Sequence, residues 1–120
     1  MTEIENKKVY DLEERTFKFA KDVREFVKSL PKNLINIDDC KQLLRASGSV
    51  GANYIEANES FSKKDFFMRT KISRKESKES RYWLNLIETP SKELEAERLK
   101  LVKEATELMM IFGSIIRKQK

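Results

Sequence analysis

The stretch SKELEAERLKLVKEATELMMIFGSIIR, residues 91–117, decides the fold class. Its apolar residues recur at the three- and four-residue intervals that mark one face of an α-helix, namely Leu94, Leu101, Val102, Ala105, Leu108, Met109, Phe112, Ile115 and Ile116. Ser91 is a preferred N-cap residue, and the basic residues that end the chain suit the negative end of a helix dipole. The pattern predicts a long amphipathic helix over about 92–117.

Two prolines and a serine-rich turn divide the preceding sequence into three further helical stretches. Pro90 precedes the last helix and Pro31 ends the first, because proline lacks a backbone donor and disfavours helical geometry in the residue before it. Ser60–Ser62 forms the remaining break, and Ser62 with Asp65 has the form of a capping box. We therefore expect helices at about 11–29, 38–59, 63–88 and 92–117.

The second expected helix has two features beyond its apolar face. Asn36 or Asp38 is placed to cap it, because both side chains accept hydrogen bonds from backbone N–H groups. Gly48 and Gly51 lie three residues apart inside it, although a glycine costs a helix about 1 kcal/mol relative to alanine. The close approach of another helix accounts for this cost, and bulkier groups at Gly48 or Ala52 would hold that neighbour away.

Short connections require each of four amphipathic helices to pack antiparallel to the one before it. We expect an all-α, antiparallel up-down-up-down four-helix bundle, formed by residues 1–120 as one domain. The composition agrees, since the 120 residues include only three glycines and two prolines and are 39% hydrophobic and 38% charged. A chain of this length can bury a sufficient core without disulfides or metal ions.

The sequence favours a cytoplasmic protein. Cys40 is the only cysteine, so it forms no disulfide within the chain and suits a reducing compartment. The polar N-terminal residues are followed by no apolar run of the kind found in secretory signals. No stretch approaches the roughly 20 apolar residues that a membrane span needs. We expect no membrane partner.

The positive charge of the chain is concentrated in one segment. Residues 63–81 hold eight basic and three acidic residues, which accounts for the net charge of +5 and leaves 17 residues of each sign elsewhere. The sequence predicts a nucleic-acid-binding face on this helix, formed by Lys64, Lys71, Arg74, Lys75, Lys78 and Arg81. Tyr82 follows at the end of the same side, where it could stack on an exposed base. The alternative is a solvated face without a partner.

Polar residues also interrupt the inward sides of the second and third helices. Folding these helices about the turn near Phe61 is expected to place opposite charges at the same level. The predicted structural ionic layer pairs Glu56 with Arg69 and Glu76 with Arg45, since buried charges persist mainly as pairs. The remote alternative is a metal-dependent hydrolase, in which Mg²⁺ binds carboxylates one helical turn apart, at Glu56, Glu59, Glu76 and Glu79.

No recognised catalytic motif supports an enzyme. The chain has no histidine, which removes the Glu-x-x-His metal motif of di-iron bundles and the usual base for a cysteine nucleophile. It has neither a phosphate-binding glycine loop nor a Gly-x-Ser-x-Gly motif. We expect Cys40 to be a buried, inert thiol, and we expect no cofactor, no small-molecule substrate and no enzymatic activity.

Several segments together resemble one bacterial family. They are LEERTFKFA at 12–20, Leu30-Pro31, QLLRASGSVGANYIEA at 42–57, KDF at 64–66, ISRKESKES at 72–80 and YWL at 82–84. This combination resembles the proteins related to the one encoded by the intervening sequence of bacterial 23S ribosomal RNA genes, also called the S23 family. The resemblance covers about residues 10–117. Ala46 departs mildly from it, because serine is commoner there.

The resemblance implies a four-helix bundle and an oligomer. Members are similar in fold to the accessory variability protein of diversity-generating retroelements, a basic ring-shaped pentamer that works with a reverse transcriptase and nucleic acid. For this chain the resemblance implies a homopentamer and favours contact with RNA or DNA. The family has no established enzymatic activity that the resemblance could imply here. The leading hypothesis is thus an oligomeric nucleic-acid-binding accessory or adaptor protein, and the alternative is a protein-interaction scaffold.

Overall fold

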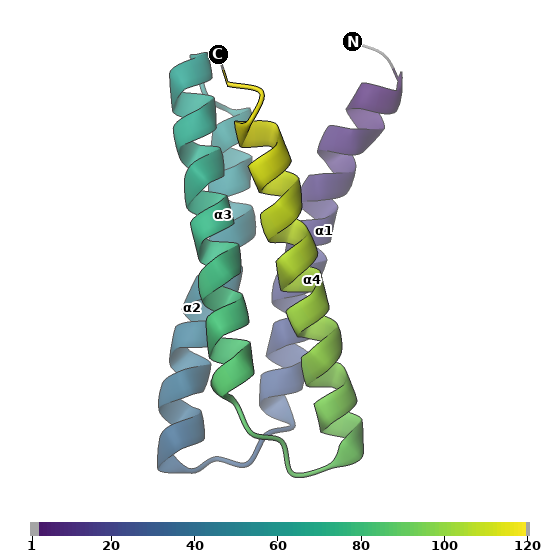
Figure 1. The fold of residues 1–120 in the computed structure, drawn as a ribbon, viewed down its shortest axis with the longest axis vertical. Coiled ribbons are helices and arrows are strands. Elements are labelled where there is room, and N and C mark those ends of the chain that lie inside the picture. Colours follow the sequence, from purple (N-terminus) through teal and green to yellow (C-terminus); the bar gives the residue numbers. More distant parts are fainter. Residues whose placement is uncertain (1–2, 120) are drawn as a thin grey trace.

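The computed structural model describes the backbone of residues 3–119 and the side chains of residues 12–119. Four helices run alternately down and up the long axis, namely α1 (Glu3–Lys28), α2 (Leu34–Asn58), α3 (Lys63–Leu86) and α4 (Lys92–Ile116) (Figure 1). The described residues contain no strand. The expectation of an all-α four-helix bundle is confirmed.

Three of the helices begin at side-chain caps. Ser62 accepts a hydrogen bond from the backbone N–H of Asp65 at 3.1 Å, and Ser91 caps α4 in the same way at 3.1 Å, as predicted. The predicted cap of α2 was wrong, because Asn33 accepts from the Asn36 N–H at 2.9 Å. The side chain of Asn36 is buried and donates to the Pro31 carbonyl at 2.9 Å, so it fixes the connector instead.

The helix boundaries differ most from prediction at two starts. α1 begins at Glu3, eight residues earlier than expected, because the residues before Asp11 include no glycine or proline that would stop a helix. α2 begins at Leu34 rather than near Asp38, because Asn33 supplies its cap. The remaining boundaries lie within two residues of those predicted.

The hydrophobic core runs the length of the bundle and receives unequal contributions from the four helices. α3 contributes only Leu84, with Ile87 just beyond its end, whereas the other helices supply most of the buried apolar side chains: Leu12, Phe19, Val23, Phe26, Cys40, Leu43, Val50, Tyr54, Leu101, Ala105, Leu108 and Phe112. Tyr54 and Phe112 pack ring against ring at 5.6 Å between α2 and α4. α3 is therefore the helix with the least apolar side facing inward.

α1 and α2 are in close contact at Gly51. A Cβ atom at this position would lie 2.9 Å from Thr16 Oγ1 and 3.2 Å from Thr16 Cβ, closer than such atoms pack. The predicted obstruction at Gly48 was misplaced, because a Cβ there would meet only the flexible end of Arg24 at 3.4 Å. Ala52 is exposed. Gly51 is thus the glycine that the packing of α1 on α2 requires.

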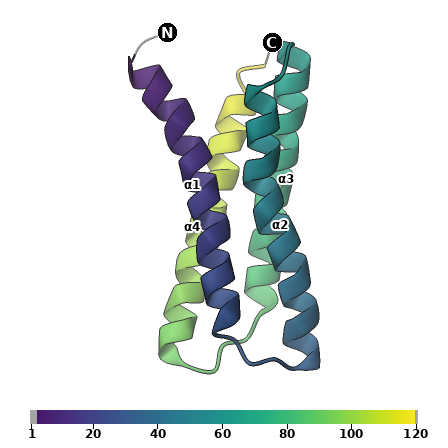
Figure 2. The same cartoon turned by 180° about the vertical axis from the view of Figure 1, so that it is seen from behind.

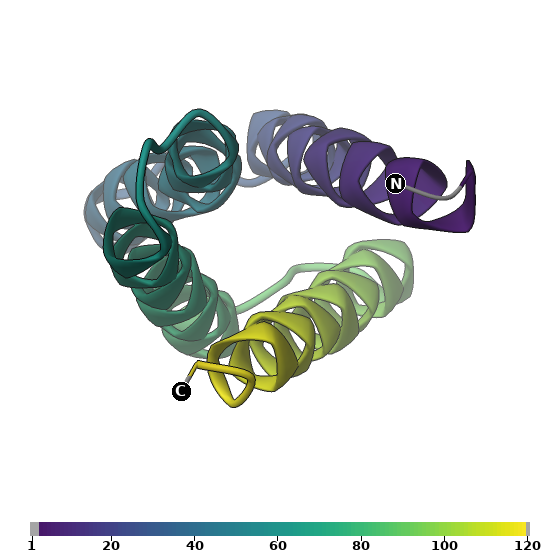
Figure 3. The same cartoon turned by 90° about the horizontal axis from the view of Figure 1, so that it is seen from above.

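The helices enclose the core unevenly. Seen from behind and from above, α2 and α3 run side by side, whereas α1 leans away from the other helices toward its N-terminal end (Figures 2 and 3). The start of α1 and the end of α4 lie at the same end of the bundle (Figure 1). Among the described residues, no helix has the length and apolar character needed to cross a membrane.

Candidate nucleic-acid interface

The inward side of α3 is polar and carries small side chains. Thr70, Ser73, Ser77 and Ser80 are fully buried. Ser73 Oγ donates to the Val50 carbonyl of α2 at 2.9 Å, and the other three hydroxyls donate to carbonyls four residues earlier in α3. These small hydroxyl groups are buried without loss of hydrogen bonds, and Glu76 is the one long charged side chain that is buried with them in α3.

Four lysines form a row on that outer side: Lys64, Lys71, Lys75 and Lys78, here called the lysine row. All four are exposed. Their spacings of seven, four and three residues keep them on one side of a helix. No described carboxylate lies within 4 Å of any of their ammonium groups. The row is therefore a strip of positive charge that forms no ion pair with the described residues.

The two arginines predicted for the same face, Arg74 and Arg81, lean toward α4. Arg81 Nη1 donates to Thr106 Oγ1 at 3.4 Å, and the side chain is only partly exposed. The guanidinium of Arg74 lies beside Gly113, 3.7 Å from the position that a Cβ atom would occupy there. The six predicted cations are thus divided into an outer row of four lysines and two arginines along the α3–α4 boundary.

Two carboxylates of α3, Glu76 and Glu79, lie toward α2. Arg45 of α2 pairs with Glu79 at 2.9 Å and with Glu76 at 3.4 Å. Glu76 is 8% exposed, and its Oε1 has no hydrogen-bond partner among the described residues. Burial, reinforced by the neighbouring Glu79 carboxylate, raises the pKa of Glu76, whereas hydrogen bonds to Glu76 and Arg45 lower the pKa of Glu79. The charge of Lys75 is a smaller cause in the same direction, so Glu79 lies near the lysine row but forms its ion pair with Arg45.

The ionic layer proposed from the sequence is assembled only in part. The structure brings Arg45 and Glu76 together, but it does not pair Glu56 with Arg69, which instead donates to Asn53 Oδ1 at 3.4 Å. Asn53 lies on the side of α2 that faces α3, three residues before Glu56, whose side chain is exposed. The register between the two helices places Arg69 one turn away from the predicted partner.

The carboxylates considered for a metal ion do not converge. Glu76 lies opposite Arg45, which is eleven residues before Glu56 on α2, or about 16 Å along the helix axis. The described residues include no group of three or more cysteine, aspartate or glutamate side chains that could hold a metal ion. The Glu56–Glu59 and Glu76–Glu79 pairs are too far apart to share one ion.

Two residues on the outer side of α3 were missed from the sequence. Met68 and Leu86 are 51% and 46% exposed and lie on the same side as the lysine row and Tyr82, which is 59% exposed. The signal was present, because Met68 follows Lys64 by four residues and Leu86 follows Tyr82 by four. The outer side of α3 is thus cationic with apolar groups between and beyond its charges.

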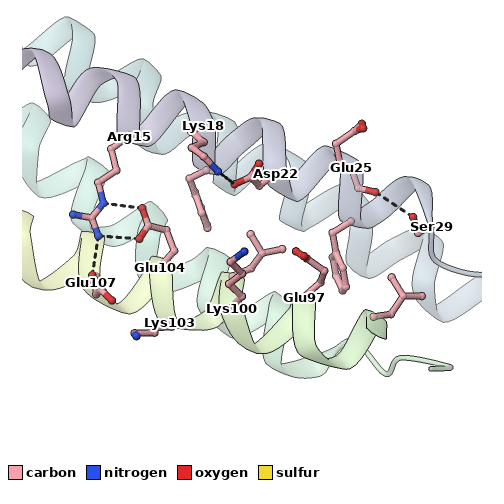
Figure 4. Close-up of a pocket in the computed structure, with 14 residues that line it drawn as sticks. Arg15, Lys18, Asp22, Glu25, Ser29, Glu97, Lys100, Lys103, Glu104 and Glu107 are labelled. Atoms are coloured by element: carbon pink, nitrogen blue, oxygen red, sulfur yellow. Dashed lines mark hydrogen bonds and ion pairs between the residues drawn. The ribbon is translucent and has the colours of Figure 1, made fainter. Parts of the chain in front are cut away.

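A second surface feature lies between α1 and α4, where these helices enclose an open groove of about 700 Å³ (Figure 4). Arg15 closes one part of it by bonding Glu104 through Nε and Nη2 at 2.8 Å each, and Glu107 through Nη2 at 2.8 Å. Phe19, Phe26 and Leu101 contribute to its apolar lining. Charges of both signs surround the groove, so its electrostatics select no single class of ligand.

Cys40 lies away from both surfaces. Its thiol is the chain's only one, and it is buried in the core. Burial is the main cause that raises its pKa, and the charge of Asp39 adds to it. A buried thiol with a raised pKa is a poor nucleophile, because the thiolate is the reactive form.

Comparison with known proteins agrees with this architecture. The family model described as 23S rRNA-intervening sequence protein matches residues 8–114. A solved structure from Bacteroides thetaiotaomicron VPI-5482, described as a protein with unknown function from the S23 ribosomal protein family, has a TM-score of 0.76 and 27% identity, covering 89% of this chain and 99% of that one. A search of curated proteins gave no match. Since the match to the family model spans nearly the whole chain, the protein belongs to the 23S rRNA-intervening sequence protein family.

Proposed function

We propose that this protein is an oligomeric accessory or adaptor protein that binds nucleic acid through the outer side of α3. The observation that carries the proposal is the lysine row, four exposed ammonium groups with no described carboxylate within 4 Å. The row lies within residues 63–81, which hold the whole net charge of the chain. A polyanion is the partner whose chemistry matches a strip of this kind.

The arrangement of charges in α3 supports the proposal energetically. Like charges three or four residues apart repel and slightly weaken a helix. Phosphates would offset that repulsion and release counterions from the nucleic acid as they bind. Glu79, which follows Lys75 by four residues, forms its ion pair with Arg45 of α2 and leaves the Lys75 ammonium without a carboxylate within 4 Å. The contact is led by charge, because no pattern of side chains on this surface is arranged to read base edges.

Assembly into a homopentamer is part of the same proposal and rests on the resemblance to the ring-shaped accessory variability protein. A ring repeats the lysine row once per subunit, so contacts that are individually weak add up along one strand. Light scattering at several protein concentrations tests it, with an expected mass of five times the 14.2 kDa of one chain. A monomer at all concentrations would remove this part of the proposal and leave the binding surface to be tested alone.

The central experiment is a salt titration of binding to labelled RNA, single-stranded DNA and duplex DNA. Four lysine contacts per subunit predict that log Kd rises with log salt with a slope of about 3 for each subunit that a single strand contacts. The variant Lys71→Glu/Lys75→Glu/Lys78→Glu should lose binding while its helical circular dichroism is retained.

The matched control reverses three exposed lysines on other helices, Lys21, Lys41 and Lys92. It changes the net charge by the same amount, and it should keep most of the binding. If the two triple variants bind equally, the surface is wrong. If no nucleic acid binds at low salt and an acidic protein is captured instead, the alternative of a protein-interaction scaffold replaces the proposal.

A further inference from the structure

The outer side of α3 carries more than charge, because Met68, Tyr82 and Leu86 expose about half of their surface there. Together with the lysine row they form a single stripe along the helix: Lys64, Met68, Lys71, Lys75, Lys78, Tyr82 and Leu86. A duplex backbone presents phosphates and keeps its base faces stacked inside, so apolar groups between the lysines gain nothing from it. Unpaired bases, in contrast, present flat apolar faces beside their phosphates.

Tyr82 differs from the other two because its ring is held in place. Its centroid lies 5.1 Å from that of Trp83, with an angle of 82° between the ring planes. Trp83 is partly buried and packs against the hydrophobic core. A ring supported from the core loses little conformational freedom when a second ring stacks on it, and this is the property that makes an aromatic side chain an effective base platform.

The position of Tyr82 also suits a strand that follows the lysine row. It lies four residues beyond Lys78, which is about 6 Å along the helix axis. That distance is on the scale of one nucleotide in an extended strand, so a phosphate at Lys78 brings the adjoining base within reach of the ring. A continuous single strand can therefore use both kinds of group at once.

We infer that the nucleic acid bound by this surface is single-stranded, with phosphates along the lysine row and one base stacked on Tyr82. This inference rests on the proposed function, because it requires the same surface. The inference adds to the proposed function the class of nucleic acid that is bound and the residue, Tyr82, on which a base stacks. Any base can occupy this position, since every base offers a face for stacking.

The test compares three ligands of equal length, about 12 nucleotides. They are a single strand, the same strand with its bases replaced by abasic sites, and the matched duplex. The single strand should bind about 5- to 100-fold more tightly than the abasic strand, which carries the same phosphates but nothing to stack. Trp83 is the only tryptophan and contacts Tyr82, so its emission should change with the single strand and remain unchanged with the abasic strand or the duplex.

Substitutions at Tyr82 separate stacking from charge. Tyr82→Ala should weaken binding to the single strand about 5- to 100-fold and leave its salt slope and its affinity for the abasic strand unchanged. Tyr82→Phe should bind as the parent does, because the ring is kept. Leu99→Ala is the matched control, since it truncates an exposed apolar side chain on α4 and should change nothing.

The outcomes distinguish the two proposals. If the abasic strand or the duplex binds as tightly as the single strand, or if Tyr82→Ala is silent while the lysine triple variant is defective, the stacking inference fails and the charge-led function stands. If neither the lysine triple variant nor Tyr82→Ala affects binding, or if no strand binds, the proposed function fails as well.

Discussion

Replacing Gly51 by alanine gives the sharpest test of how α1 packs on α2. The added Cβ would lie 2.9 Å from Thr16 Oγ1 and 3.2 Å from Thr16 Cβ. Thr16 is 1% exposed, and its hydroxyl donates to the Glu13 carbonyl at 3.0 Å. The backbone carbonyl carbon of Thr16 lies 3.6 Å from the same point. The new methyl group must therefore displace either the hydroxyl or the backbone of α1.

Two opposing contributions set the magnitude. Alanine is favoured over glycine inside a helix by about 1 kcal/mol. Overpacking costs about 1–3 kcal/mol, and loss of the Thr16–Glu13 hydrogen bond costs about 1 kcal/mol. The cost exceeds the gain, so Gly51→Ala should lower the free energy of unfolding by about 1–3 kcal/mol. For a chain of this size the melting temperature should fall by about 4 °C per kcal/mol.

Gly48→Ala is the matched control within the same helix. Its Cβ would meet only the guanidinium of Arg24 at 3.4 Å, and this side chain can move. The helix-propensity gain then stands nearly unopposed, so Gly48→Ala should stabilise the protein by about 0.5–1 kcal/mol. Urea unfolding at one protein concentration, followed by circular dichroism and by Trp83 emission, measures both variants against the parent.

The two glycine variants together test the contact between α1 and α2. Gly51→Ala should be less stable than Gly48→Ala by about 1.5–4 kcal/mol, although the chemical change is identical. The double variant Thr16→Ala/Gly51→Ala should lose at least about 0.5 kcal/mol less than the two single variants together, because the 2.9 Å contact is gone. If both glycine variants are equally stable, α1 does not pack on α2 at this distance.

Three further predictions follow from the ion pairs and buried groups. Arg15→Gln removes the ion pairs to Glu104 and Glu107 and should lower the free energy of unfolding by about 1 kcal/mol at low salt. The difference from the parent should shrink in 1 M salt, because salt screens the charges. A loss independent of salt would mean that packing, not charge, is responsible. Burial raises the pKa of Glu76 in the folded protein. Protonation of Glu76 therefore stabilises the folded state fully at pH values below the ordinary glutamate pKa, and this stabilisation is lost as the pH rises through the raised pKa of the folded protein. Glu76→Gln should therefore melt higher than the parent at pH 8, with a difference that shrinks toward pH 4.5, and a variant less stable at pH 8 would contradict this sign. Cys40 should react slowly with a thiol reagent in the folded protein and rapidly in urea. Fast reaction in the folded protein would contradict the burial and the raised pKa of the Cys40 thiol.

Local patterns in the sequence were sufficient to predict the helices. The apolar spacing of residues 92–117, the prolines at 31 and 90, and the serine caps at 62 and 91 act over one or two helical turns. Such short-range signals specify where a helix can form and where it ends. They failed at Asn33 because several asparagine and aspartate residues lie near the start of α2, and only the folded connector selects among them.

The lysine row could likewise be predicted from the sequence, because its members belong to one helix and spacing fixes the side they share. The directions of Arg74 and Arg81 could not, since they depend on Thr106 and Gly113 of the neighbouring helix α4. The same holds for Arg69, whose partner is decided by the register of α3 against α2.

The ion pairs of Arg15 were decided by tertiary structure alone. The contacts of Arg15 with Glu104 and Glu107 join residues far apart in the chain, and no pattern within either helix indicates them. The sequence by itself determined four amphipathic helices and a concentration of positive charge in the third, because periodicity and local charge are properties of single segments. Which glycine touches a neighbour, which acids are paired, and which arginines turn toward α4 were decided only when the helices packed, because each depends on the relative rotation and register of two helices.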